Sequence, residues 1–286
     1  MPRTPRRSNL PPRPEDTAPT VHDDELLRFE AEGPWPLPVA DEEGHVEHEG
    51  ARIWYATFGN GAPVVLLHGG LGNAGNWGYQ VPALLRAGRR VLVIDARGHG
   101  RSTWDGRPLG YELMASDVAA VLRKLGIARA HFVGWSDGAV TALLLASREP
   151  ASVAGVLFFA CNVDASGTKE FEFTPLVKRC FHRHQRDYAA LSATPDGFGA
   201  LAEAVERMQR TKPDLSREDL AAIRVPVTVV HAEHDEFIRG DHTAYVAESL
   251  PNAVLVLLDG VGHFAPVQRP ELFDRTVAAF LSRDRT

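Results

Sequence analysis

The stretch that most constrains this chain is Gly134-Trp135-Ser136-Asp137-Gly138, which lies between an apolar run at 130–133 and an Ala- and Leu-rich run at 139–148. The first run is typical of a short buried strand and the second of a helix. A strand-to-helix turn this short leaves no room for side chains beside its apex, so glycine is expected on both sides. Ser136 is at the apex, where its hydroxyl would project beyond the strand and face the helix N-terminus.

The chain on both sides of this turn has the pattern of a parallel sheet. Segments 44–50 and 51–57 are typical of a hairpin, and short apolar runs then alternate with helical patterns. The apolar runs lie at 64–67, 90–94, 153–160, 225–230 and 253–258, and the helical patterns at 77–85, 114–125 and 270–282. This alternation predicts an α/β fold with a mostly parallel central sheet and helices on both faces.

The alternation is interrupted after residue 161, where helical stretches occur without a strand of the core type. We predict that residues 162–221 form a helical cap over the carboxyl edge of the sheet. Residues 45–161 and 222–286 would then form the core of the fold. Residues 1–44 are predicted to be a largely disordered tail, because the first 20 are rich in Pro and Arg and contain little apolar surface to bury. An amphipathic pattern at 21–31 is compatible with one short helix in this tail.

The overall charge and the lack of long apolar stretches exclude several classes of partner. The formal net charge is −6, so no global field would attract nucleic acid or an anionic membrane. No apolar stretch approaches the roughly 18 to 20 residues that span a bilayer, and the two cysteines show no framework spacing. We therefore expect a cytoplasmic protein that acts on a small molecule, without nucleic acid or membrane partners. Its oligomeric state is left open.

A serine hydroxyl is a weak nucleophile, so it needs an imidazole to take its proton and a carboxylate to orient that imidazole. Asp235 and His263 follow Ser136 in the chain, each just beyond a predicted strand. Because the carboxyl ends of parallel strands meet at one edge of a sheet, these side chains are expected to converge. We predict Ser136 as nucleophile, His263 as general base and then acid, and Asp235 as the residue that orients His263. Glu233 and Glu236 are the alternatives for Asp235.

A glycine-rich segment, His68-Gly69-Gly70-Leu71-Gly72, directly follows the apolar run at 64–67. Backbone N–H groups in such a segment can point into the crevice at the end of the sheet. The predicted oxyanion hole consists of the N–H groups of Gly70 and Asp137, with Leu71 as the alternative to Gly70.

These motifs together resemble the α/β-hydrolase superfamily over roughly residues 46–282. The resemblance rests on His68-Gly69-Gly70, Asp95-x-Arg97-Gly98-His99-Gly100-x-Ser102, Gly134-x-Ser136-x-Gly138, Asp235 and Gly262-His263. It implies an α/β-hydrolase fold and serine hydrolase chemistry that needs no cofactor. Within the superfamily, Gly134 to Gly138 is similar to valacyclovirase-like amino-acid ester hydrolases. In that subgroup the acid after the nucleophile is held to bind the α-ammonium of the substrate, a role that the resemblance implies for Asp137.

The charge of Asp137 can be checked against the chemistry expected beside it. A carboxylate about 6 Å from a developing oxyanion would oppose it by roughly 3 kcal/mol at an effective dielectric of 20, so Asp137 must point away or meet a cation. A substrate ammonium would satisfy it. So would the first turn of the following helix, where an acid is favourable without any ligand.

Other polar and aromatic clusters have simpler interpretations. Leu71, Trp77 and Trp135 are candidates for substrate contact, although core packing explains the two tryptophans equally well. His231 with His234, and His182 with His184, resemble metal ligands only in composition, so no metal site is predicted.

One side of the helical stretch near residue 180 is expected to be a solvated basic face of the cap; its residues are Lys178, Arg179, His182, Arg183 and Arg186. Asp95 and Arg97 are expected to brace the loops beneath the site.

We conclude from the sequence that the chain is a serine hydrolase cleaving a small carboxylic ester through an acyl-enzyme. The alternatives are hydrolysis of an amide or a C–C bond with the same residues, or a receptor-like binding protein of this fold. The acyl and leaving groups are left open.

Overall fold

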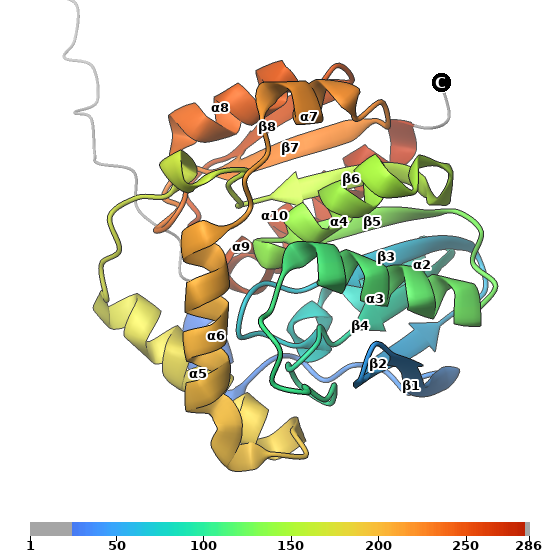
Figure 1. Ribbon diagram of the computed structural model, residues 1–286, viewed down its shortest axis with the longest axis vertical. Helices are drawn as coiled ribbons and strands as arrows, with labels where there is room; N and C mark the ends of the chain where they lie inside the picture. Colours follow the sequence, from blue (N-terminus) through green and yellow to red (C-terminus); the bar gives the residue numbers. More distant parts are fainter. Residues whose placement is uncertain (1–24, 284–286) are drawn as a thin grey trace, which may run out of the picture.

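The computed structural model describes residues 25–283, in which eight strands form one sheet in the order β1-β2-β4-β3-β5-β6-β7-β8 (Figure 1). The strands are β1 (Glu42–His48), β2 (Ala51–Phe58), β3 (Ala62–Leu67), β4 (Arg89–Ile94), β5 (Ala130–Trp135), β6 (Val153–Phe159), β7 (Val227–Ala232) and β8 (Ala253–Leu258). β2 pairs antiparallel with both β1 and β4, and all pairs from β4 to β8 are parallel. The predicted α/β fold with a mostly parallel sheet is confirmed.

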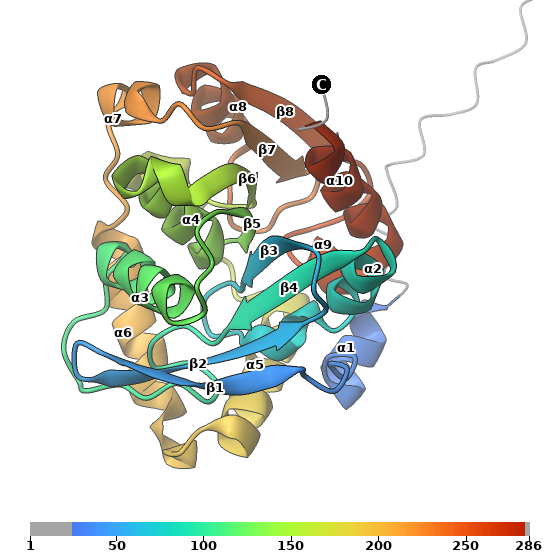
Figure 2. The ribbon, with the colours of Figure 1, turned by 90° about the vertical axis from the view of Figure 1, so that its right-hand side faces the viewer.

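Helices cover both faces of this sheet (Figure 2). One face carries α3 (Tyr111–Lys124), α4 (Asp137–Arg148) and α8 (Gly240–Ser249), and the other carries α2 (Gln80–Arg86) and α10 (Pro270–Ser282). A 3₁₀ turn, η1 (Ala74–Trp77), precedes α2, and the short helix α9 (Ala265–Gln268) precedes α10.

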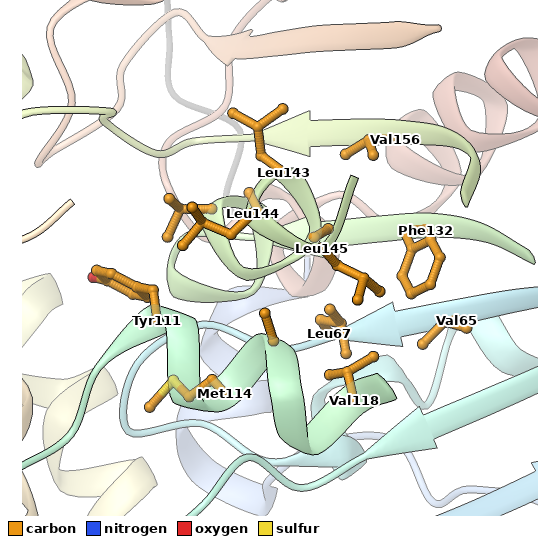
Figure 3. Close-up of a cluster of buried hydrophobic side chains, with 14 of the residues drawn as sticks. Val65, Leu67, Tyr111, Met114, Val118, Phe132, Leu143, Leu144, Leu145 and Val156 are labelled. Carbon is orange, nitrogen blue, oxygen red and sulfur yellow. The ribbon is translucent and has the colours of Figure 1, made fainter. Parts of the chain in front are cut away.

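The apolar runs of the central strands are continuous because both of their faces are buried. Val65 and Leu67 of β3 pack with α3 and α4 (Figure 3), while Val64 and Leu66 point to the opposite face and pack with α2 and α10. The core is therefore two apolar layers, one on each side of the sheet. This packing fixes the ends of the strands, where the predicted site residues lie.

The alternation of strands and helices is interrupted between β6 and β7, where several helices are inserted. The inserted segment contains η3 (Ala165–Gly167), α5 (Pro175–Leu191), η4 (Pro195–Gly197), α6 (Phe198–Thr211) and α7 (Arg217–Ala222). Figure 1 shows α5 and α6 beyond the arrowheads of the central strands. Ser136 lies at the same edge, because it directly follows β5. We refer to α5 to α7 and the segments joining them to β6 and β7 as the insertion.

The N-terminal helix α1 (Leu26–Glu32) packs against α5 of the insertion and α9 of the core. Its buried Glu30 accepts a hydrogen bond from Arg179 Nε at 2.5 Å, and its backbone oxygen accepts one from Arg186 at 2.6 Å. Arg183 pairs with Asp187 on the same helix. The basic face expected on α5 is thus only partly solvated, because α1 covers it. The expectations for residues 1–24 lie outside the described residues.

Candidate active site

Ser136 connects β5 to α4 in a backbone conformation that non-glycine residues seldom adopt, with φ 53° and ψ −123°. The glycines on either side of it are needed for close packing. A Cβ on Gly134 would lie 2.4 Å from Ala139 Cα, and a Cβ on Gly138 would lie 2.1 Å from the carbonyl oxygen of Leu67. Strained residues of this kind concentrate at functional sites, so the turn is a candidate site in its own right.

The glycine-rich segment after β3 lies directly against Ser136. A Cβ on Gly69 would come within 3.1 Å of Ser136 Cβ and 3.8 Å of its Oγ. His68 holds this segment: its Nε2 accepts the Ala96 N–H at 3.0 Å, and its Nδ1 therefore donates to the Gly69 carbonyl at 2.7 Å. Burial lowers the pKa of His68 to about 4, so the ring is neutral and acts as a fixed brace.

The carboxylate of Asp137 is buried next to this segment. It accepts a hydrogen bond from Tyr111 Oη at 2.8 Å, and both of its oxygens accept from Gln209 Nε2, at 3.0 and 3.1 Å. A Cβ on Gly70 would lie 2.7 Å from Asp137 Oδ2, so only glycine fits here without displacing the carboxylate. Burial raises the pKa of Asp137, against the opposing hydrogen bonds from Gln209 and Tyr111. Gln209 lies on α6 of the insertion and belongs to no recognisable sequence motif.

Asp235 and His263 are brought together by the loops that follow β7 and β8. His263 Nδ1 lies 3.1 and 3.2 Å from the two carboxylate oxygens of Asp235, and both side chains are buried. Asp235 Oδ1 also accepts the backbone N–H groups of Phe237 and Ile238, each at 2.9 Å. These three partners fix the carboxylate on the Nδ1 side of the imidazole, which leaves Nε2 on the other side.

The two neighbouring acids bind backbone rather than the His263 ring. Glu236 accepts the backbone N–H of His263 at 2.7 Å, and Glu233 accepts the backbone N–H of Gly260 at 2.8 Å. Both therefore hold the loop that carries His263. Of the three acids, Asp235 is the one whose carboxylate contacts the imidazole.

The net effect of these charges raises the pKa of His263. Burial alone would lower it, but the charge of Asp235 and its hydrogen bond outweigh burial, and Glu236 and Asp137 add to the effect. Conversely, burial would raise the pKa of Asp235, yet its interactions with His263 and the two backbone N–H groups lower it. Each of the two groups therefore favours the charged form of the other, the condition under which a carboxylate stabilises an imidazolium.

The residues on both sides of Ser136 interact with His263. The Trp135 and His263 rings lie 6.2 Å apart between centroids, and the Asp137 charge acts on His263 as described above. Among residues 25–283, however, no hydrogen bond joins Ser136 Oγ to the His263 ring. Hydrogen bonds between catalytic side chains often tighten only in the complex with substrate.

The two tryptophan candidates lie in the core. Trp77 is fully buried, Trp135 is 3% exposed, and their rings make an edge contact at 6.2 Å within the apolar layer on the α2 side. Leu71 is half-buried with φ 63° and packs on the opposite layer. A ring that the sequence analysis missed, Phe237, lies edge-on to His263 with 4.7 Å between centroids.

Asp95 and Arg97 brace the loops around the site, as expected. Asp95 accepts the N–H groups of Ala74 and Arg101, and Arg97 makes a two-pronged contact with buried Asp117. Within the described part of the chain, no three His, Cys, Asp or Glu side chains are grouped as metal ligands. None of the helices described is both long and apolar enough to cross a membrane.

Comparison with known proteins places this architecture in a family. Residues 64–276 match the alpha/beta hydrolase family. The bifunctional esterase/perhydrolase DCH of Acinetobacter calcoaceticus is 28% identical over 270 residues, covering 82% of this chain and 97% of that protein. The non-heme chloroperoxidase CPO-A1 of Kitasatospora aureofaciens is 27% identical over 269 residues, covering 82% and 98%. Among solved structures, Est816, described as an N-acyl homoserine lactone degrading enzyme, is 27% identical with a TM-score of 0.65, covering 83% and 100%. The chain therefore belongs to the alpha/beta hydrolase family and is a hydrolase by that membership.

Proposed function

We propose that this protein hydrolyses a small carboxylic ester through an acyl-enzyme, with Ser136 as nucleophile, His263 as general base and acid, and Asp235 as the residue that orients His263. The observation that carries the proposal is the contact of His263 Nδ1 with both oxygens of Asp235, beside a serine in a strained turn. The esterase relative supports the choice of ester.

In the proposed acylation step, His263 Nε2 takes the hydroxyl proton as Ser136 Oγ attacks the ester carbonyl carbon. The negative charge that forms on the carbonyl oxygen is stabilised by the backbone N–H groups of Gly70 and Asp137. The imidazolium, stabilised by Asp235, then donates its proton to the departing alkoxide oxygen. An acyl-enzyme and a free alcohol result.

Deacylation repeats this sequence with water in place of the serine. His263 removes a proton from water, the hydroxide oxygen attacks the acyl carbon, and the proton returns to Ser136 Oγ as the carboxylic acid leaves. No cofactor takes part in the proposed mechanism.

The test is a panel of p-nitrophenyl and aminoacyl esters, with matched amides, assayed with the wild-type protein and with Ser136→Ala. We expect turnover of esters with a burst of product at short times, and loss of this turnover in Ser136→Ala. Equal rates for the two proteins would disprove the mechanism. A single turnover that never recovers would instead indicate a receptor-like protein.

A second candidate is an amino-acid ester as substrate, which the environment of Asp137 favours. The Asp137 carboxylate is buried and its hydrogen-bond donors, Tyr111 and Gln209, are both neutral. A substrate ammonium would add the positive charge that these donors do not supply. Comparing Asp137→Ala on an aminoacyl ester and its deaminated analogue tests this, since equal losses on both would exclude the role.

A further inference from the structure

Two exposed phenylalanines lie at the start of the insertion. Phe171 is 64% exposed and Phe173 is 50% exposed, and both belong to the segment between η3 and α5. Their rings contact each other, with centroids 6.0 Å apart. Single exposed apolar side chains are common on protein surfaces, but adjacent ones form an apolar patch that is a candidate binding surface.

A continuous series of ring contacts leads from the exposed Phe171 through Phe237 to His263. Phe171 stacks on Phe237 with 6.2 Å between centroids and an interplanar angle of 12°. Phe237 in turn makes the edge contact with His263 described above. Phe173 extends the surface to Phe181 of α5, at 5.8 Å. We call Phe171, Phe173, Phe181 and Phe237 the aromatic wall.

The position of the aromatic wall is fixed by backbone contacts. The Lys169 N–H donates to the Phe237 carbonyl at 2.7 Å, and the Arg239 N–H donates to the Gly167 carbonyl at 2.9 Å. Thr168 and Ile238 form an antiparallel bridge between these bonds. Residues 167–169, just before Phe171, are therefore paired with the loop carrying Asp235, and this pairing brings Phe171 next to Phe237.

The chemistry of the neighbouring base identifies which part of a substrate would meet the wall. In the proposed mechanism His263 protonates the departing oxygen, so the alcohol portion must lie on the His263 side of the ester. Planar apolar groups bind well to aromatic faces. The charges beside the phenylalanines are mixed, since exposed Glu170 and Glu172 alternate with them and Lys169 Nζ donates to the Asp235 carbonyl. They offer no excess of either sign to an ionic alcohol, so the aromatic faces favour a neutral one.

We propose that the aromatic wall is the binding site for the leaving group of the ester, and that it selects a neutral alcohol carrying an aromatic ring. This proposal rests on the proposed function. It makes Phe171, Phe173 and Phe237 specificity-determining residues that neither the sequence motifs nor the family membership assign.

The experiment compares benzyl acetate with ethyl acetate, which pass through the same acetyl-enzyme, so that kcat/KM differs only through binding and acylation. We expect the wild-type protein to prefer benzyl acetate, and Phe171→Ala to reduce that preference roughly 3- to 10-fold, mainly through KM. Phe171→Tyr should retain it. Leu257→Ala is the matched control, because Leu257 is 56% exposed and lies on β8, outside the wall.

A second measurement separates failure of this proposal from failure of the proposed function. Binding of benzyl alcohol to Ser136→Ala, followed by calorimetry or ligand-observed NMR, needs no turnover. It should weaken several-fold when Phe171→Ala is added. If Ser136→Ala retains full activity, the proposed function is wrong; if Ser136→Ala is inactive but Phe171→Ala leaves both the substrate preference and benzyl alcohol binding unchanged, the wall is not the leaving-group site.

Discussion

Asp137, the residue after the predicted nucleophile, is held by Gln209 from the insertion, whose amide donates to both carboxylate oxygens at 3.0 and 3.1 Å. This contact joins the core to α6 at the turn that carries Ser136. Because Asp137 is buried, loss of one donor leaves part of a charged group without a partner.

We therefore expect Gln209→Ala to lower the free energy of unfolding by about 1–3 kcal/mol, the usual cost for a hydrogen bond to a buried charged group. Arg210→Ala is the control on the same helix, because the Arg210 side chain is 74% exposed and pairs with Glu206 one turn away. Its effect should stay below about 1 kcal/mol. Urea titration of both variants checks this, and equal losses would show that the contact with Asp137 is unimportant.

The sheet and the turn at Ser136 could be predicted because their residues act locally. Continuous apolar runs such as 64–67 identify doubly buried strands, and Gly134 and Gly138 identify a turn without space for a Cβ. The predicted helix boundaries agree less well with the structure where capping hydrogen bonds determine the first residue of the helix. The helix expected at 77–85 is a 3₁₀ turn followed by α2, since Asn73 and Asn76 form a capping box that starts the turn at Ala74.

Contacts between distant segments could not be predicted in the same way. Gln209 and Phe237 have no motif, and their importance follows only from α6 and the β7 loop being folded against Asp137 and His263. The choice of Asp235 over Glu233 and Glu236 likewise depends on which carboxylate reaches the ring. Sequence order limits the candidate acids to the loop after β7. Which of them contacts His263 depends on the direction of each side chain in the folded loop.

Asp235→Ala should strongly impair hydrolysis while leaving substrate binding nearly intact. The imidazole would lose the partner that fixes its tautomer and stabilises its charged form, and by analogy with other triads kcat should fall roughly 10³- to 10⁴-fold. Steady-state kinetics on the best ester of the panel measures this. Glu233→Ala, which removes a backbone contact in the same loop, should be far milder; a larger loss in Glu233→Ala would reverse the assignment.

The raised pKa of His263 predicts the acid side of the pH profile. The general base must be unprotonated, so kcat/KM should fall as the pH drops through a pKa above the ordinary value of 6.5. Asp235→Asn removes the charge that raises this pKa, and should move the inflection of the residual activity to lower pH. Glu236→Gln should move it in the same direction by less. An inflection in Asp235→Asn at or above that of the wild type would contradict this account.

Gly138→Ala should destabilise the protein because the added Cβ would lie 2.1 Å from the backbone oxygen of Leu67, at the end of β3. Neither backbone can yield without moving the Ser136 turn, so we expect a loss of about 1–3 kcal/mol together with reduced activity. Gly199→Ala on α6 is the control, since a Cβ there has no neighbour within 4 Å. Its unfolding midpoint should remain unchanged or rise slightly, because alanine favours a helix.

Removing one partner of the buried ion pair between Arg97 and Asp117 should destabilise the protein more than replacing both partners with apolar residues. Arg97 donates to both Asp117 oxygens, at 2.6 and 3.0 Å, and to the backbone oxygens of His48 and Glu49, each at 3.0 Å. Asp117→Ala leaves a guanidinium uncompensated in the core and should cost about 3–5 kcal/mol of unfolding free energy.

The double variant Arg97→Met with Asp117→Leu removes both charges, so it should be less destabilised than Asp117→Ala alone, even though it also loses the contacts to His48 and Glu49. Chemical denaturation of the two variants, with far-UV circular dichroism as the signal, gives the comparison. A double variant that is less stable than the single one would mean that the backbone contacts of Arg97, rather than its charge pairing, hold the β1–β2 turn against the loop after β4.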